Sequence, residues 1–162
     1  MKKLRLLLTS AVILLAGCGG VKVIDYNDKL VDLTDACFSA EGTVRDALDA
    51  ENYGVANELL DAALTTCQTS KTKAEAMDAY KNDSSLKEAV VALLDTEIEY
   101  LKTFKDYVAY RSLDELTEEQ EAAYNALDAE LDAIDNRIVA ASDNLVTVQE
   151  AFAATHGFDL EE

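Results

Sequence analysis

The sequence contains no proline and only one histidine, His156, among its 162 residues. Proline interrupts helices because it lacks a backbone donor and its ring clashes with the preceding turn, so its absence favours long uninterrupted helices. The single histidine also excludes the usual di-iron centre of helical bundles, which needs Glu-x-x-His on two helices. We expect His156 to lie at the C-terminal end of a helix, where a cation suits the helix dipole; the alternative is a metal ligand.

Motifs that would indicate an enzyme are absent from the sequence as well. There is no glycine-rich phosphate loop, nucleophile elbow, Ser-His-Asp arrangement or calcium loop. We therefore predict that the protein is not an enzyme and that it uses neither a cofactor nor a metal.

The first twenty residues, MKKLRLLLTSAVILLAGCGG, combine a positive start, an apolar run and small residues before Cys18. The apolar run at 6–15 is too short to span a bilayer of about 30 Å, and it suits a cleaved signal peptide. Leu15-Ala16-Gly17-Cys18 resembles the lipobox of bacterial lipoproteins. This resemblance implies cleavage before Cys18 and attachment of lipid, palmitate included, to that cysteine. The alternative is an ordinary secretory signal that happens to contain a cysteine.

The lipobox resemblance divides the chain into a signal peptide at 1–17, a lipidated anchor and linker at 18–22, and a helical domain at 23–162. It implies a place in the bacterial cell envelope, on the outer membrane if the source is Gram-negative. The body would then lie in the periplasm or at the cell surface.

Basic side chains are scarce, with 14 lysines and arginines against 32 acidic residues. Cleavage removes three basic side chains and no acidic one, which leaves a net side-chain charge of −21. Such a body should repel nucleic acid and favour cations or basic partners. The simpler alternative is that the acidic residues only keep the helix faces solvated.

Apolar residues recur at alternating spacings of three and four over about 23–48, 53–80, 84–112 and 118–155, which places each set on one helix face. Thr117 and Gln120 have the spacing of a capping box before the fourth segment. Short connections favour antiparallel neighbours. We therefore predict an all-α fold, an antiparallel up-down-up-down four-helix bundle after a cleaved signal peptide. The stripe of the first segment would be Val23, Tyr26, Leu30, Leu33, Cys37, Ala40, Val44 and Ala47.

Cys37 and Cys67 both lie on these stripes, each 15 residues from Asn52 at the centre of the first turn. An antiparallel hairpin places them at one level, and helix axes about 8–10 Å apart bring facing Cα atoms within reach of a disulfide. Export from the reducing cytosol allows the bond to persist. We predict a disulfide; the alternative is two buried free thiols that act as small apolar side chains.

Two groups of acidic residues bear on function. Glu97 stands where the apolar spacing of the third segment slips, so it could point inward and pair with Arg137, or face solvent at the helix flank. The second group of acidic residues lies at the two turns that an up-down-up-down bundle places far from the anchor, whereas most lysines lie nearer the anchored end. We predict that this acidic end is a surface for a basic or cationic partner of the envelope or host, formed by Asp49, Glu51, Glu115, Glu118 and Glu119.

Short motifs at the two ends of the mature chain give a second resemblance. Tyr26-Asn27-Asp28 opens the first helical segment, and Phe152-Ala153 followed by Gly157-Phe158-Asp159-Leu160 closes the last one. Together they resemble a family of small bacterial lipoproteins with helical-bundle bodies and no established activity. We therefore expect a membrane-anchored, non-catalytic binding or structural module. The alternative is a carrier of a small molecule or cation, bound on the acidic surface or in a cavity between helices.

Overall fold

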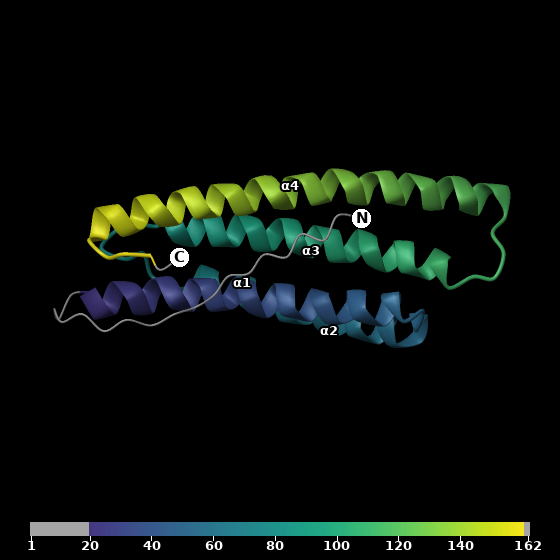
Figure 1. Ribbon diagram of the computed structural model, residues 1–162, viewed down its shortest axis with the longest axis horizontal. Helices are drawn as coiled ribbons and strands as arrows, with labels where there is room; N and C mark the ends of the chain where they lie inside the picture. The colour runs from purple at the N-terminus through teal and green to yellow at the C-terminus, as the bar shows by residue number, and fades with distance from the viewer. Residues whose placement is uncertain (1–19, 161–162) are drawn as a thin grey trace.

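Four long helices joined by short turns make up the protein in this computed structural model, which describes residues 20–160 (Figure 1). They are α1 (Gly20–Asp49), α2 (Tyr53–Ala76), α3 (Ser85–Arg111) and α4 (Glu118–His156). Successive helices run in opposite directions, so the predicted all-α, up-down-up-down bundle is confirmed. The signal peptide and Cys18 lie outside the described residues. No helix within 20–160 is both long enough and apolar enough to cross a membrane.

The ends of the helices follow local side-chain chemistry. Thr117 and Gln120 form the predicted capping box, with each side chain bonded to the other residue's backbone N–H, so α4 begins at Glu118. Gly157 ends α4 in the left-handed conformation, at φ 73°, which glycine adopts without strain. The second helix ends at Ala76, earlier than the predicted Tyr80, because the backbone of Met77 turns to an extended conformation.

The buried stripe of α1 differs from the predicted one by one position in every heptad. The prediction placed Tyr26, Leu33 and Ala40 on the stripe, but these three are only half-buried at its flank. Polar residues take their places: Asn27 accepts a hydrogen bond from α4, whereas Thr34 and Glu41 form their hydrogen bonds within α1. The stripe that the structure buries consists of Val23, Asn27, Leu30, Thr34, Cys37, Glu41 and Val44.

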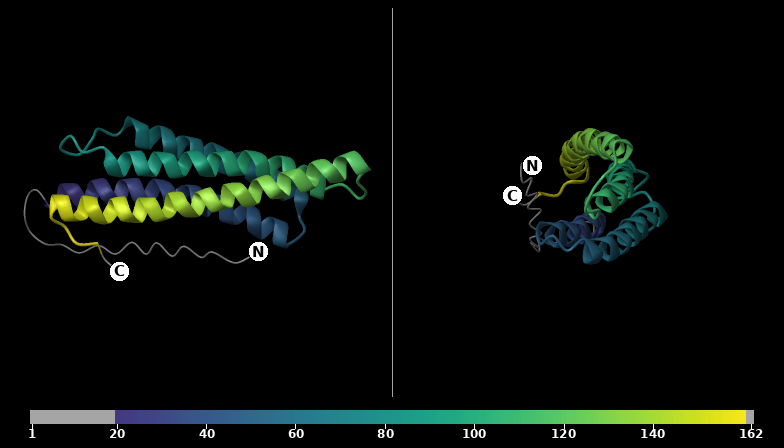
Figure 2. Two further views of the ribbon diagram at one scale, coloured as in Figure 1. Left: turned by 90° about the horizontal axis from the view of Figure 1, so that it is seen from above. Right: turned by 90° about the vertical axis from the view of Figure 1, so that its right-hand side faces the viewer.

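The bundle is more open between α1 and α4 than between its other neighbouring helices. In the end-on view, α3 stands between α4 and the pair formed by α1 and α2 (Figure 2). The first and last helices pack closely over a short stretch only, and within the described chain α2 does not touch α4. Consequently α3 contributes most to the core, from Leu86 near its start to Val108 near its end.

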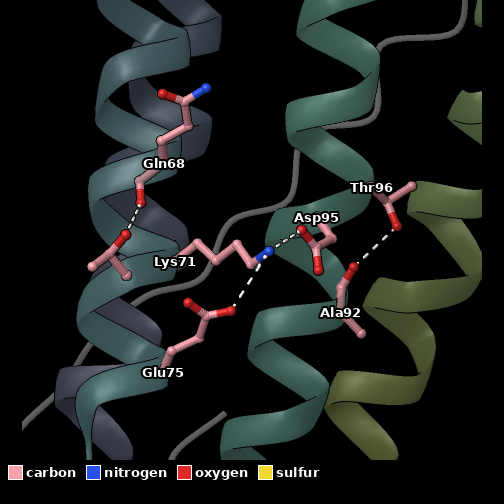
Figure 3. Close-up of polar contacts among 7 residues, drawn as sticks. Gln68, Lys71, Glu75, Ala92, Asp95 and Thr96 are labelled. Atoms are coloured by element: carbon pink, nitrogen blue, oxygen red, sulfur yellow. Dashed lines mark hydrogen bonds and ion pairs between the residues drawn. The ribbon is translucent and has the colours of Figure 1, made fainter.

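Covalent and ionic links hold the other helix pairs together. The predicted disulfide between Cys37 and Cys67 is confirmed, and it joins α1 to α2 with the Cα atoms 4.6 Å apart. Lys71 of α2 binds Asp95 of α3 at 2.6 Å while it also approaches Glu75 of its own helix at 3.5 Å (Figure 3). Among the described residues, no disulfide or ion pair joins α1 to α4, and their contact includes buried polar side chains.

Candidate polar site inside the bundle

Two rows of polar residues face each other where α1 meets α4. On α1 the row is Asn27, Thr34 and Glu41, and all three are buried. On α4 the corresponding row is Asp135, Ser142 and Gln149, again seven residues apart; Ser142 is buried, Gln149 is half-buried and Asp135 is exposed. Gln149 Nε2 donates to Asn27 Oδ1 at 2.8 Å, which sets the antiparallel register. Steps of seven residues then bring Thr34 level with Ser142 and Glu41 level with Asp135. We call these six residues the polar seam.

An arginine and a tyrosine extend one end of the polar seam into the bundle. Arg45 Nε donates to Glu41 Oε1 at 2.5 Å, and the same carboxylate forms an ion pair with Nη2 of the guanidinium. That nitrogen also donates to the hydroxyl of Tyr100 on α3 at 2.9 Å. The guanidinium lies over the rings of Tyr100 and Phe104, 5.1 and 5.8 Å from their centres. Arg45 therefore has all its main interactions with Glu41 and α3.

Glu97 of α3 is buried beside this group without a hydrogen-bond partner. Its side chain is 1% exposed, and neither carboxyl oxygen has a partner among the described residues. The prediction that Glu97 points inward is confirmed, but its pairing with Arg137 is wrong. Arg137 lies on the exposed side of α4 and binds Glu99 at 2.6 Å, because Glu99 is two residues further along α3 and faces outward.

The electrostatics of this site disfavour an ionised Glu97 most strongly. Burial raises the pKa of Glu97 well above its ordinary value, and the charge of Glu41 raises it further, against a smaller opposing effect of Arg45. Burial likewise raises the pKa of Glu41, although Arg45 counteracts it, and burial raises the pKa of Asp135. Burial also raises the pKa of the Tyr100 hydroxyl. We call Glu41, Arg45, Glu97, Tyr100 and Asp135 the polar cluster.

The polar cluster can hold protons and orient hydrogen bonds. Within residues 20–160, no three His, Cys, Asp or Glu side chains converge closely enough to hold a metal ion. The cluster also contains no cysteine, serine or histidine that could act as a nucleophile beside a base. Sequence reasoning identified Glu97 from the slip in apolar spacing, but it missed Glu41, Arg45 and Asp135, which look like ordinary charged residues of helix surfaces.

The residues predicted as a partner surface are all exposed, as such a surface requires. They lie on the turn between α1 and α2 and on the turn between α3 and α4, at the same end of the bundle (Figure 1). The α3–α4 hairpin extends beyond the α1–α2 hairpin at this end (Figure 1). Asp49, Glu51, Glu115, Glu118 and Glu119 are therefore divided between two tips rather than gathered on one flat face.

At the opposite end an aromatic cluster joins the termini of the described chain. Phe152 is 1% exposed and packs against Tyr26, Tyr80 and Phe158, with ring centres 5.8, 5.9 and 6.1 Å away. His156 stacks edge-on against Tyr80 and binds Asp83 Oδ2 at 3.0 Å, so its contact is to the α2–α3 turn. The sequence motifs that gave the lipoprotein resemblance thus meet in one place, which their separation in the sequence did not reveal.

A shallow hollow lies between α3 and α4 near the tip of that hairpin. Its volume is about 520 Å³, and small side chains such as Ala109, Ala123 and Ala126 leave the space open. Asp106 and Glu130 line it together with Tyr110 and Leu127. The combination of an apolar floor and two carboxylates suits a small cationic molecule better than an anionic one.

Comparison of the chain with protein-family models, curated proteins and solved structures finds no match in any of the three.

Proposed function

We propose that this protein is a membrane-anchored lipoprotein of the bacterial envelope whose helical body is a non-catalytic binding or structural module. The observation that carries the proposal is the lipobox at Leu15–Cys18, placed two residues before α1 begins at Gly20. With so short a linker, a lipid on Cys18 would hold the bundle directly against the membrane. Two or more acyl chains anchor a protein firmly, at about 0.8 kcal/mol per buried CH₂.

The dimensions of the bundle support a role in presenting a surface away from the membrane. The 39 residues of α4 span about 58 Å at 1.5 Å per residue. An anchor at the start of α1 places the acidic tips at the distant end of this length. The near end carries the exposed lysines Lys22, Lys29, Lys73 and Lys81, each of which gains at most about 1 kcal/mol beside anionic headgroups. Lys71 contributes less to such a contact because it already binds Asp95.

Metabolic labelling with a fatty-acid analogue tests the anchor. We expect the full-length protein to take up label and to fractionate with membranes, and Cys18→Ser to lose both properties. The matched control is Cys37→Ser combined with Cys67→Ser, which leaves Cys18 as the only cysteine and should keep the label. Undiminished label in Cys18→Ser would overturn the proposal.

Charge reversal at the tip tests the binding role. Glu115→Lys, Glu118→Lys and Glu119→Lys together should abolish cross-linking of the anchored protein to a basic partner in intact envelopes. The control reverses three exposed acids on the sides of the bundle, Asp32, Asp143 and Glu150, and should leave cross-linking unchanged. Equal cross-linking by the tip variant and the wild type, with both folded, would exclude the tips as the binding surface.

The hollow between α3 and α4 favours the alternative function, a carrier of a small cation. Calorimetric titration with spermidine is a direct test, because this flexible polyamine can bridge the carboxylates of Asp106 and Glu130. Binding that Asp106→Asn and Glu130→Gln abolish would support the carrier. Binding that these substitutions leave intact would place the polyamine elsewhere on the acidic surface.

A further inference from the structure

The burial of the Glu97 carboxyl group without hydrogen-bond partners among residues 20–160 is explained neither by the anchor nor by the acidic tips. A buried carboxyl group without hydrogen-bond partners is costly, and an ionised one is far more so. Its side chain is 1% exposed and both its oxygens lack partners in the described structure. An apolar residue at this position would avoid that cost, as Leu93, Leu94 and Leu101 do on the same helix.

The groups that face Glu97 come from three of the four helices. Its neighbour Tyr100 shares α3, Glu41 and Arg45 approach from α1, and Asp135 approaches from α4. The described residues of α2 contribute no charged group to this set. Glu41 engages Arg45 through two guanidinium nitrogens, one of which also donates to Tyr100, so the described cation that acts on Glu97 has its hydrogen bonds with other groups. An ionised Glu97 would therefore face the carboxylates of Glu41 and Asp135, and the opposing effect of Arg45 is smaller than the effect of Glu41.

A proton is the ligand that fits this position. It neutralises the carboxyl group without needing a cavity, whereas a metal ion needs several converging ligands and space between them. Residues 20–160 contain no group of side chains arranged to hold a metal. The positive guanidinium of Arg45 beside Glu41 would also repel a bound cation.

The contact between α1 and α4 is the part of the bundle that ionisation of Glu97 would disturb. A disulfide joins α1 to α2, ion pairs such as Lys71–Asp95 join α2 to α3, and Arg137–Glu99 joins α3 to α4. Among the described residues, α1 and α4 are joined by the hydrogen bond from Gln149 to Asn27 and by the stacking of Tyr26 on Phe152, and the register places Asp135 opposite Glu41. A negative charge on Glu97 of α3 would repel Glu41 of α1 and Asp135 of α4, and within residues 20–160 no disulfide or ion pair joins α1 to α4 to oppose their separation.

We propose that Glu97 is a proton-binding site that controls this contact: the neutral carboxylic acid keeps α4 closed against α1, and loss of the proton opens the bundle along the polar seam. The opened form exposes Glu97 to water, where its carboxyl group can ionise. The response to pH follows from the pKa of Glu97, which burial raises in the closed form. Between the ordinary pKa of a glutamate, about 4.3, and the raised pKa, the closed form binds one more proton than the open form. The opening equilibrium constant should therefore rise by about tenfold for each pH unit in that range.

Carboxyl-carbon NMR and hydrogen exchange on the full-length, acylated protein in detergent test both parts of this proposal. The Glu97 signal, assigned by its absence from Glu97→Gln, should show a carboxyl group that stays protonated well above the ordinary pKa of a glutamate. Amide protection over 131–149, after correction for the chemical exchange rate, should fall about tenfold per pH unit in the wild type. Glu97→Gln should show almost no such dependence, because its amide cannot ionise. Glu58→Gln, an exposed control on α2, should keep the wild-type slope.

The same measurements also define the results that would refute the proposal. A Glu97 signal that titrates near pH 4 overturns the proton site, and an equal slope in Glu97→Gln overturns its control of opening. A thermal midpoint that EDTA lowers in the wild type but not in Glu97→Gln would identify a bound metal and also overturn the proposal. If Glu97→Gln does not fold, Glu97→Leu replaces it, because leucine removes the charge and needs no hydrogen bond. Persistence of the wild-type slope in Glu97→Leu would again refute the proposal.

Discussion

Reduction of the Cys37–Cys67 disulfide should destabilise the bundle by a substantial fraction of its folding free energy. The bond joins residues 30 apart and both cysteines are fully buried. On the chain-entropy account, closing a loop of this length removes about 3.5 kcal/mol of unfolded-state entropy. A domain of this size is stable by only about 5–15 kcal/mol. The melting temperature should fall by about 10 °C, because each kcal/mol shifts it by about 2–4 °C in chains near this length.

The assay compares urea unfolding of oxidised and reduced protein, followed by circular dichroism at 222 nm. Reduction removes the covalent link while it keeps both sulfur atoms, so no cavity is created in the core. The double variant Cys37→Ala, Cys67→Ala should be insensitive to reductant and serves as the control. A loss below about 1 kcal/mol on reduction would refute the loop-entropy argument for this protein, because that value is far under the expected effect.

Three further predictions concern the ends of the helices and the aromatic cluster. Thr117→Ala should lower the free energy of unfolding by about 1 kcal/mol, because it removes one half of the capping box, and urea titration measures the loss. Phe152→Ala should cost about 3–5 kcal/mol in the same assay, since the ring is buried among Tyr26, Tyr80 and His156. Hydrogen bonds from Ser85, and then from His156, hold the pKa of Asp83 below its ordinary value. Because the folded pKa is lowered, this contribution to stability is present above about pH 4 and disappears as the pH falls through the folded pKa. Asp83→Asn should therefore flatten the acid side of the melting-temperature profile, and an unchanged acid slope would contradict this assignment.

The parts of the fold that sequence predicts well are those with strong local signals. The four apolar stripes predicted the four helices. Cys37 and Cys67 are equally far in sequence from Asn52, and in an antiparallel hairpin such residues lie at the same height along the helices, so the disulfide could be predicted. Thr117 and Gln120 form a capping box whose two bonds involve only neighbouring residues, so spacing alone is sufficient to predict it. None of these features depends on how distant helices pack.

The polar cluster was difficult to predict because its members differ from surface residues only in their surroundings. Tyr26, Leu33 and Ala40 fit the same three-four spacing as Asn27, Thr34 and Glu41, and apolar character favoured the wrong set. The choice between the two sets depends on which helix lies opposite, and α4 is distant in sequence. Arg137 was assigned to Glu97 rather than Glu99 for the same reason. Two residues along a helix lie on opposite sides of it, so Glu97 points into the core whereas Glu99 points to the surface, where it binds Arg137.

The placement of covalent and polar contacts suggests which parts of the bundle could move together. The disulfide makes α1 and α2 one unit, and the proposed lipid at Cys18 would attach that unit to the membrane. The α3–α4 hairpin carries Glu115, Glu118 and Glu119, and it meets α1 through the polar cluster and the polar seam. Because ion pairs join α3 to α2, opening along this seam would shift α4, which carries Glu118 and Glu119, relative to the membrane while Asp49 and Glu51 stay with the anchored pair. A partner that contacts both tips would bind the closed form more tightly, so protonation of Glu97 and partner binding would reinforce each other. Glu97→Leu, which favours closure at every pH, should then make partner cross-linking independent of pH, whereas a retained pH dependence would separate the two properties.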